Sequence, residues 1–317
     1  MTAPDVGSSR KSLRRRALSI LLLLVLLAAF GFALAGRWDA VVRRLRDQDA
    51  GVLVGAFALC LAAAVMSFLL WRGVLKALGS AVPVVAGGRI FFVAQIGKYL
   101  PGSVWPVVVQ MRMGKEAGIP RARTGLAFVL TLGLSLIWGV FVGLLALPAL
   151  VTDGDPHLGW LVLLLPLVAV LLVPRVVNAL LDRMLRLLRR PGLEQPLAGR
   201  SIAAASAWTL ALWVVFGLHV WVLATGLGAE PLVTLPVAIG AFALAFSIGP
   251  LLVVLPAGAG VREAALVVLL ATVLDTPEGT AVALTSRALI IATDGLLALT
   301  GLAGPRLLRL VGPKPSL

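Results

Sequence analysis

Long apolar runs with almost no charge dominate this sequence. Residues 17–35, 51–71 and 125–148 contain no Asp, Glu, Lys or Arg. A run of about 20 apolar residues matches the hydrocarbon thickness of a bilayer, where backbone groups must find their hydrogen bonds within the chain. The sequence therefore predicts an all-α membrane protein.

The composition of the chain agrees with several such spans. Of the 317 residues, 60% are hydrophobic and 13% are charged, and the mean hydropathy is +1.03. A soluble domain does not carry so much apolar surface. We expect a polytopic helical bundle of about 7–8 transmembrane helices.

The net charge of +14 comes from 28 Lys and Arg against 14 Asp and Glu. The arginines stand at the ends of apolar runs, which is typical of cytoplasmic loops, so we expect no nucleic-acid partner. Cys60 is the single cysteine, and His157 and His219 lie far apart, so neither a disulfide nor a zinc pattern exists. The sequence also lacks a Walker lysine loop and a complete Gly-x-Gly-x-x-Gly. We therefore expect no metal and no cofactor.

Three parts are predicted along the chain. Residues 1–16 indicate a disordered basic cytoplasmic tail, residues 17–304 a transmembrane domain, and residues 305–317 a short cytoplasmic tail. Residues 33–35, Ala-Leu-Ala, resemble a signal-peptidase site, but the apolar run exceeds the roughly 7–15 residues of a signal sequence, and further spans follow it. We expect a retained first helix and a cytoplasmic N-terminus in the cell membrane.

The charges of the loops orient the other spans. Residues 176–188 alternate apolar and basic positions at helical spacing, which predicts a helix on the membrane surface. Residues 275–279 are acidic and turn-like. The basic tail with Arg306, Arg309 and Lys314 is expected in the cytoplasm, so residues 262–274 must cross most of the bilayer. The spans predicted after the first helix are residues 51–71, 125–148, 158–173, 203–225, 232–255 and 281–302.

Two apolar stretches are interrupted by Gly, Pro and ionisable residues, one in each half of the chain. Basic residues flank both ends of the first, residues 87–111. Both ends are therefore expected in the cytoplasm, which predicts a re-entrant pair of half-helices that turns at residues 98–106. The second broken stretch is residues 256–264. Interrupted segments in both halves are typical of transporters with a site near the membrane midplane.

Both broken stretches carry a resemblance to a known family. Residues 97–105, Gly-Lys-Tyr-Leu-Pro-Gly-Ser-Val-Trp, resemble its first signature, and residues 256–263, Pro-Ala-Gly-Ala-Gly-Val-Arg-Glu, resemble its second. Arg287, after Thr285-Ser286, is similar to a weaker third feature. The family is the lysylphosphatidylglycerol synthase transmembrane region, also called the flippase-like membrane domain family, and the resemblance covers residues 15–310.

The resemblance implies an inner-membrane protein that moves a lipid or lipid-linked headgroup between leaflets. In two-part family members, aminoacyl transfer belongs to a separate soluble C-terminal domain. The chain ends at Leu317, shortly after its last predicted span, so we expect that domain to be absent and do not expect an enzyme. Relatives often carry a Glu-Arg pair in the span after the first motif, whereas residues 125–139 contain no charge.

Ionisable and shape-determining residues of the broken stretches and the last span form the candidate site. An ammonium at bilayer depth costs about 2.5–3.5 kcal/mol, so Lys98 either faces a wet cavity that holds a lipid phosphate or snorkels to the headgroups. The glycines and prolines are expected to act through backbone shape. The candidate substrate-binding residues are Lys98, Tyr99, Pro101, Gly102, Trp105, Gly258, Gly260, Arg262, Glu263, Arg287 and Asp294.

Several of these residues keep two interpretations. Tyr99 and Trp105 either line a lipid path or belong to an interfacial aromatic belt. Arg262 suits a phosphate, and Glu263 can hold Lys98 or Arg287 or take up a proton; alternatively, Arg262 and Glu263 cap a helix at the membrane surface.

Two ionisable positions and one histidine lie within predicted spans. Arg287 and Asp294 are seven residues apart and so share one helix face. Asp294 is expected near mid-membrane, either as an ion-pair partner or as a proton site. His219 is expected to be a neutral imidazole bonded to a neighbouring helix.

Three functions fit these patterns. The first is a lipid translocase that acts on a phospholipid or lipid-linked substrate. The second is a membrane-embedded transferase for a lipid-linked substrate, which would need a positioned base and usually a metal or nucleotide site; the sequence offers only Glu263 and Asp294 for these roles. The third is a non-transporting subunit of another membrane protein. The possible protein partners are a second copy of the chain or a separate soluble synthase.

Overall fold

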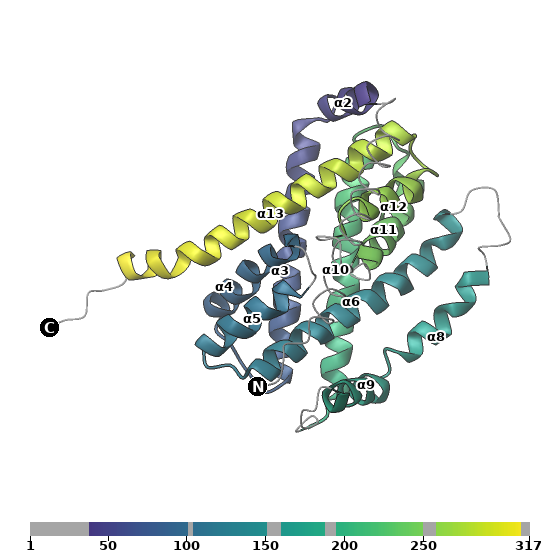
Figure 1. The fold of residues 1–317 in the computed structure, drawn as a ribbon. Helices are drawn as coiled ribbons and strands as arrows, with labels where there is room; N and C mark the ends of the chain where they lie inside the picture. Colours follow the sequence, from purple (N-terminus) through teal and green to yellow (C-terminus); the bar gives the residue numbers. More distant parts are fainter. Residues whose placement is uncertain (1–37, 101–103, 151–159, 188–194, 250–257, 312–317) are drawn as a thin grey trace, which may run out of the picture.

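A computed structural model describes residues 38–100, 104–150, 160–187, 195–249 and 258–311, and within these ranges every regular element is a helix (Figure 1). The predicted first span, residues 17–35, lies outside them. The elements are α2 (Trp38–Arg46), α3 (Ala50–Ala77), α4 (Val84–Gln95), η1 (Ile96–Tyr99), α5 (Trp105–Glu116), α6 (Arg121–Leu150), η3 (Trp160–Leu164), α8 (Leu165–Val170), α9 (Pro174–Leu187), α10 (Gly199–Thr225), α11 (Pro231–Ile248), α12 (Val261–Leu270) and α13 (Thr276–Val311).

Five described helices, α3, α6, α10, α11 and α13, are long and apolar enough to cross a membrane. The bent pair of segments Trp160–Val170 and Pro174–Leu187 brings the number to six if it is counted as one span. The predicted polytopic all-α bundle is confirmed, and the expected number of 7–8 spans is only approximate.

The predicted span at residues 158–173 is wrong as a single long helix. The chain forms the 3₁₀-helix η3 and the short α8 here, and then bends by 73° into α9. Together η3 and α8 are about 20 Å long, less than the roughly 30 Å of a bilayer core. Prolines punctuate this segment, since Pro166 lies in the first turn of α8 and Pro174 begins α9. The helix predicted at residues 176–188 is confirmed as amphipathic α9, which buries Val177, Leu181 and Leu185.

Two predicted boundaries in the second half are also wrong. Helix α11 ends at Ile248, short of the predicted end of the span at residues 232–255, and residues 250–255 lie outside the described ones. Helix α12 has 10 residues and so measures about 15 Å, which is too short for residues 262–274 to cross most of the bilayer.

The acidic residues 275–279 do not form a separate turn, because Asp275 directly precedes helix α13 and residues 276–279 are its first turn. The backbone N–H of Glu278 donates to Asp275 Oδ1 at 2.8 Å, and the N–H of Asp275 donates to Glu278 Oε2 at 3.3 Å. This reciprocal pair satisfies N–H groups that a helix start leaves without partners. At its other end α13 continues to Val311, so the first part of the predicted tail at residues 305–317 is helical.

Contacts between loops define two ends of the bundle. At the first, which we call the basic end, Arg123 of α6 donates from Nη1 to the backbone oxygen of Gly79 after α3, at 2.9 Å. At the second, which we call the opposite end, Gly226 after α10 lies so close to Val52 of α3 that an added Cβ would be 2.8 Å from its Cγ1. Helix α3 therefore runs from the opposite end to the basic end, and α10 runs the other way.

Helices α4 and α5 form a first hairpin, residues 84–116, which enters the bundle from the basic end (Figure 1). Its arms start after α3 and return to α6, where Gly114 lies against Thr124. The arms meet at Gly97, where an added Cβ would lie 3.0 Å from the backbone nitrogen of Pro106. The predicted pair of half-helices is confirmed.

Helices α11 and α12 form a second hairpin, residues 231–270, which enters from the opposite end (Figure 1). It starts beside the end of α10, where Trp221 Nε1 donates to the backbone oxygen of Pro231 at 2.8 Å. It ends beside the start of α13, where Val267 contacts Gly279. The sequence predicted the break in this segment but not its return to the same end.

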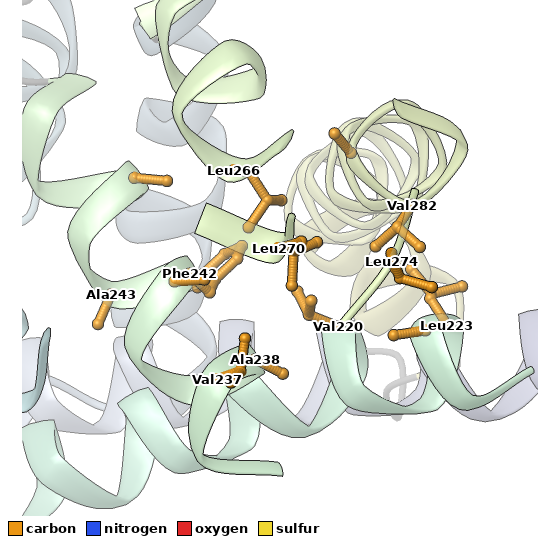
Figure 2. Packing of buried hydrophobic residues seen from close by; sticks show 14 of the residues in the cluster. Val220, Leu223, Val237, Ala238, Phe242, Ala243, Leu266, Leu270, Leu274 and Val282 are labelled. Carbon is orange, nitrogen blue, oxygen red and sulfur yellow. The ribbon is translucent and has the colours of Figure 1, made fainter. Parts of the chain in front are cut away.

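Two hydrophobic cores hold the hairpins in place. The core of the first hairpin packs Phe91 of α4 against Phe68 and Trp71 of α3. In the core of the second hairpin, Phe242 of α11 and Leu270 of α12 pack with residues of α10 and α13 (Figure 2). Within lipid, such close side-chain packing is what holds helices together.

Candidate functional site

A cavity of about 250 Å³ lies between the breaks of the two hairpins. The first hairpin contributes Lys98 and Tyr99 to its wall, and the second contributes Gly258 and Arg262. Helix α13 supplies further polar groups, and α3, α6 and α10 close the remaining sides. Because each hairpin comes from a different end of the bundle, the cavity lies in the interior of the membrane domain.

Lys98 lies in η1, the tight turn at the tip of the first hairpin. Its Nζ is 2.7 Å from Asp294 Oδ2 of α13, and the Tyr99 hydroxyl donates to the same oxygen at 2.5 Å. The Lys98 side chain is 30% exposed and the Asp294 side chain 8% exposed. Of the two interpretations of Lys98, the structure therefore favours a lysine that faces the cavity. Of the two interpretations of Asp294, the structure favours the ion-pair partner.

Glu263 joins the second hairpin to α13. Its Oε1 is 3.3 Å from Arg287 Nη1, and its Oε2 accepts from the backbone N–H of Gly260 at 2.7 Å. Gly260 has a φ of +84°, a conformation that favours glycine, and it precedes the first turn of α12. Glu263 thus caps a helix and holds Arg287, but it does so in the buried interior rather than at a surface.

Arg262 is different from the other cations of the cavity. It is 7% exposed, and its guanidinium carbon lies 4.8 Å from the centre of the Phe242 ring and 5.3 Å from that of Phe246. Over the described ranges of the chain, it forms neither a hydrogen bond nor an ion pair. Cation–π contacts attract a guanidinium but do not neutralise its charge. Arg262 therefore offers its charge and its donors to the cavity.

Among the described residues, the ionisable groups around the cavity leave one positive charge in excess. Lys98, Arg262 and Arg287 are cationic, whereas Glu263 and Asp294 are the carboxylates that pair with them. Burying an uncompensated charge is costly unless a counter-charge enters. The arrangement is therefore suited to an anion that carries one negative charge.

The structure brings together most of the predicted site residues, but not all of them. Trp105 is 43% exposed and does not line the cavity, because its neighbour Pro106 occupies the inward face of the helix. Pro101 and Gly102 lie outside the described residues. Gly258, with a φ of +67°, does line the cavity and lies against Gly249.

Sequence reasoning missed the uncharged polar residues of the wall, which include Ser67, Gln95, Gln110, Thr131, Ser135 and Thr293. Gln110 of α5 and Thr293 of α13 are buried and line the cavity. An amide within an apolar half-helix is a signal that could have identified Gln110. The prediction that His219 bonds to a neighbouring helix is confirmed, since its Nε2 is 2.8 Å from Ser286 Oγ of α13.

Long apolar helices, two hairpins from opposite ends and a charged internal cavity define a multi-pass helical membrane protein with a site in its interior. The chain belongs to the family of the lysylphosphatidylglycerol synthase TM region, whose model matches residues 11–298. The resemblance of the two broken stretches is thereby confirmed. Among curated proteins, none matches the chain significantly.

Proposed function

We propose that this protein is a lipid translocase that moves a phospholipid or a lipid-linked headgroup between the leaflets of the cell membrane. The observation that carries the proposal is Arg262, which is buried at the cavity without a carboxylate partner among the described residues. A guanidinium binds phosphate through parallel charge-assisted hydrogen bonds. A lipid phosphate therefore supplies the counter-charge that the cavity lacks.

The hairpins supply a path from each side. Irregular backbone occurs at membrane depth only where it is buried in protein or lines a water-filled cavity. The described residues next to both breaks meet this condition, since Lys98 and Gly258 line the same cavity. A site between broken segments is the arrangement that lets transporters expose a ligand alternately to the two faces.

The size of the cavity favours a headgroup rather than a whole lipid. Its volume of about 250 Å³ is below the roughly 300–1,000 Å³ of sites for drug-sized ligands. The acyl chains would therefore remain in the bilayer while the headgroup crosses through the cavity. Membership of a family associated with a lipid synthase agrees with a lipid substrate.

The charges of the loops orient the protein. Arg112, Lys115, Arg121 and Arg123 gather at the basic end, which we assign to the cytoplasm by the positive-inside rule. Helix α3 begins at the opposite end, so a span at residues 17–35 would return the N-terminus to the cytoplasm. The first hairpin then opens from the cytoplasm and the second from the outer face.

Lipid exchange in reconstituted vesicles tests this function. Purified protein is placed in vesicles with an acyl-chain-labelled anionic phospholipid, and dithionite quenches only the label in the outer leaflet. We expect rapid loss of the inner-leaflet label with the wild type and at least a tenfold slower loss with Arg262→Ala, because a buried charge partner is worth about 2–5 kcal/mol.

Arg112→Ala is the matched control, because Arg112 is an exposed cation that pairs with Glu116 at 3.5 Å on the first hairpin. Its exchange rate should equal that of the wild type. The function is refuted if the wild type exchanges lipid no faster than protein-free vesicles. A role for Lys98 in holding the lipid phosphate is refuted if Lys98→Ala and the wild type exchange lipid equally fast.

A further inference from the structure

Helix α9 presents a surface that the interior cavity does not explain. Its sequence predicted a place on the membrane surface, and the structure divides its circumference into three strips. We infer that α9 is a second lipid site, separate from the cavity, which binds anionic phospholipid headgroups of the leaflet at the basic end. This site concerns the lipid that surrounds the protein rather than a lipid that crosses it, so it stands apart from the proposed function.

The first strip of α9 faces the protein. Val177, Leu181 and Leu185 recur at helical spacing and are each 5% exposed, in the same hydrophobic core as the first hairpin. Asn178 fastens the helix, since its Nδ2 donates to the backbone oxygen of Leu197 at 3.0 Å and its Oδ1 accepts from the N–H of Leu197 at 2.8 Å. Leu197 shortly precedes α10, which begins at the basic end, so α9 lies at that end (Figure 1).

The direction of α9 suits a helix at the edge of the bilayer. Helix α8 packs against α6, one of the helices long enough to cross the membrane, and the chain then bends by 73° into α9. This bend turns α9 away from the direction of α8 and toward the plane of the membrane. A helix in that position meets the headgroups and the adjoining acyl region. The two strips that do not face the protein are therefore available to lipid.

The second strip is basic. Arg175, Arg183 and Arg186 fall within about 80° of the circumference of an ideal helix. All three are exposed, and over the described ranges none of them forms an ion pair. Asp182, the carboxylate of α9, is only partly exposed. Residues 174–200 hold six arginines against two carboxylates, so this region attracts anions.

The third strip is apolar and lies next to the basic one. Val176, Leu180 and Leu187 fall within about 40° of one another. Leu180 is 49% exposed and Leu187 77% exposed, so the described part of the protein leaves both largely uncovered. A basic strip alone would fit any acidic partner, whereas a basic strip beside an apolar one fits the boundary between anionic headgroups and acyl chains. The occupant of this surface is therefore the lipid leaflet.

Fluorescence quenching by brominated lipids measures which lipid occupies this surface. Leu187→Cys, in a full-length variant without the native cysteine, carries an environment-sensitive dye. The protein is placed in phosphatidylcholine vesicles that contain phosphatidylglycerol or phosphatidylcholine with brominated acyl chains. We expect the brominated anionic lipid to quench the dye with about fivefold higher relative affinity, the effect of about one arginine near an anionic surface. Equal affinities of the two brominated lipids overturn the inference.

Variants of the basic strip separate charge from fold. The combined substitutions Arg175→Gln, Arg183→Gln and Arg186→Gln should bring the relative affinity close to one. The same three positions changed to Lys should keep most of the preference, because an ammonium also attracts an anionic surface. About 1 M salt should weaken the preference of the wild type, since exposed charges are screened. A preference that survives the three Gln substitutions contradicts the assignment.

Two further measurements control for position. Arg112→Gln, Lys115→Gln and Arg121→Gln together remove three exposed cations at the basic end but outside α9, and should leave the preference unchanged. Loss of the preference in this control would assign it to the net charge of the basic end and overturn the site. A dye at Ala179→Cys, within the basic strip, should be quenched less by acyl-chain bromine than a dye at Leu187→Cys. The reverse order contradicts the placement of the apolar strip in the acyl region.

Discussion

The ion pair between Lys98 and Asp294 should show an asymmetry that follows from burial. Lys98→Met leaves the carboxylate of Asp294, which is 8% exposed, with the Tyr99 hydroxyl as its one remaining donor among the described residues. Asp294→Asn leaves the ammonium of Lys98 without its partner, but that side chain is 30% exposed at the cavity and can be hydrated. We therefore expect the lysine variant to be the less stable one.

The magnitudes follow from what each variant leaves behind. Removing one partner of a buried pair costs about 3–5 kcal/mol, so Lys98→Met should cost about 3 kcal/mol. Asp294→Asn should cost about 1 kcal/mol, as for a partly exposed pair. The double variant leaves neither charge and should also cost about 1 kcal/mol, which gives a coupling energy of about 3 kcal/mol. Each kcal/mol lowers the melting temperature by about 2 °C at this size.

Thermal unfolding in detergent measures these costs, with intrinsic tryptophan fluorescence as the signal. The expected decreases are about 6 °C for Lys98→Met and about 2 °C for the other two variants. Lys115→Met removes an exposed cation from the same hairpin and should leave the melting temperature unchanged. Two results refute the reasoning: a double variant whose cost is the sum of the single costs, or an Asp294→Asn variant less stable than Lys98→Met.

Further predictions concern packing, topology and the buried imidazole. Gly97→Ala should cost about 1–3 kcal/mol, because its Cβ would press on the other arm of the hairpin, whereas Gly133→Ala, with no atom within 4 Å of its Cβ, should be neutral in the same thermal assay. In a variant without the native cysteine, Ala117→Cys and Ala271→Cys should react with a membrane-impermeant maleimide from opposite sides of oriented vesicles; reaction from one side would refute the two entry directions. His219→Leu should lower stability by about 1–3 kcal/mol, since it leaves a buried serine hydroxyl on α13 without its partner, and an unchanged melting temperature would contradict that role.

The first hairpin could be predicted because its evidence lies within one short stretch. Gly97 and Pro106 interrupt an apolar run, and basic residues on both flanks require both ends to lie on one side. The second hairpin is flanked instead by the acidic residues Glu230 and Asp275. Acidic residues contribute little to the positive-inside rule, so they do not tell on which side the hairpin ends lie. The length of α12 shows that the second segment turns back, because 10 residues cannot span a bilayer. The sequence alone did not place the start or the end of this helix.

The residues of the site were predictable, but their pairing was not. An ionisable residue in an apolar run signals function by its cost, which identifies Lys98, Arg262 and Asp294 without a structure. The choice of partner for Glu263 depends on where the second hairpin places it relative to α13. Glu263 and Asp294 pair with different cations. Arg287 and Asp294 lie seven residues apart on α13, where Arg287 pairs with Glu263 of the second hairpin and Asp294 pairs with Lys98 of the first.

These pairings separate stability from transport. Lys98 and Arg287 each join a hairpin to α13, so their variants should weaken the fold. Arg262 joins nothing through an ion pair in the described residues, and an anion can bind to it without breaking either pair. A buried charge that lacks a counter-charge carries a desolvation cost, and an apolar side chain of similar size removes that cost. Arg262→Met should therefore melt no lower than the wild type while it exchanges lipid slowly. Loss of stability with unchanged exchange would instead assign Arg262 to the fold.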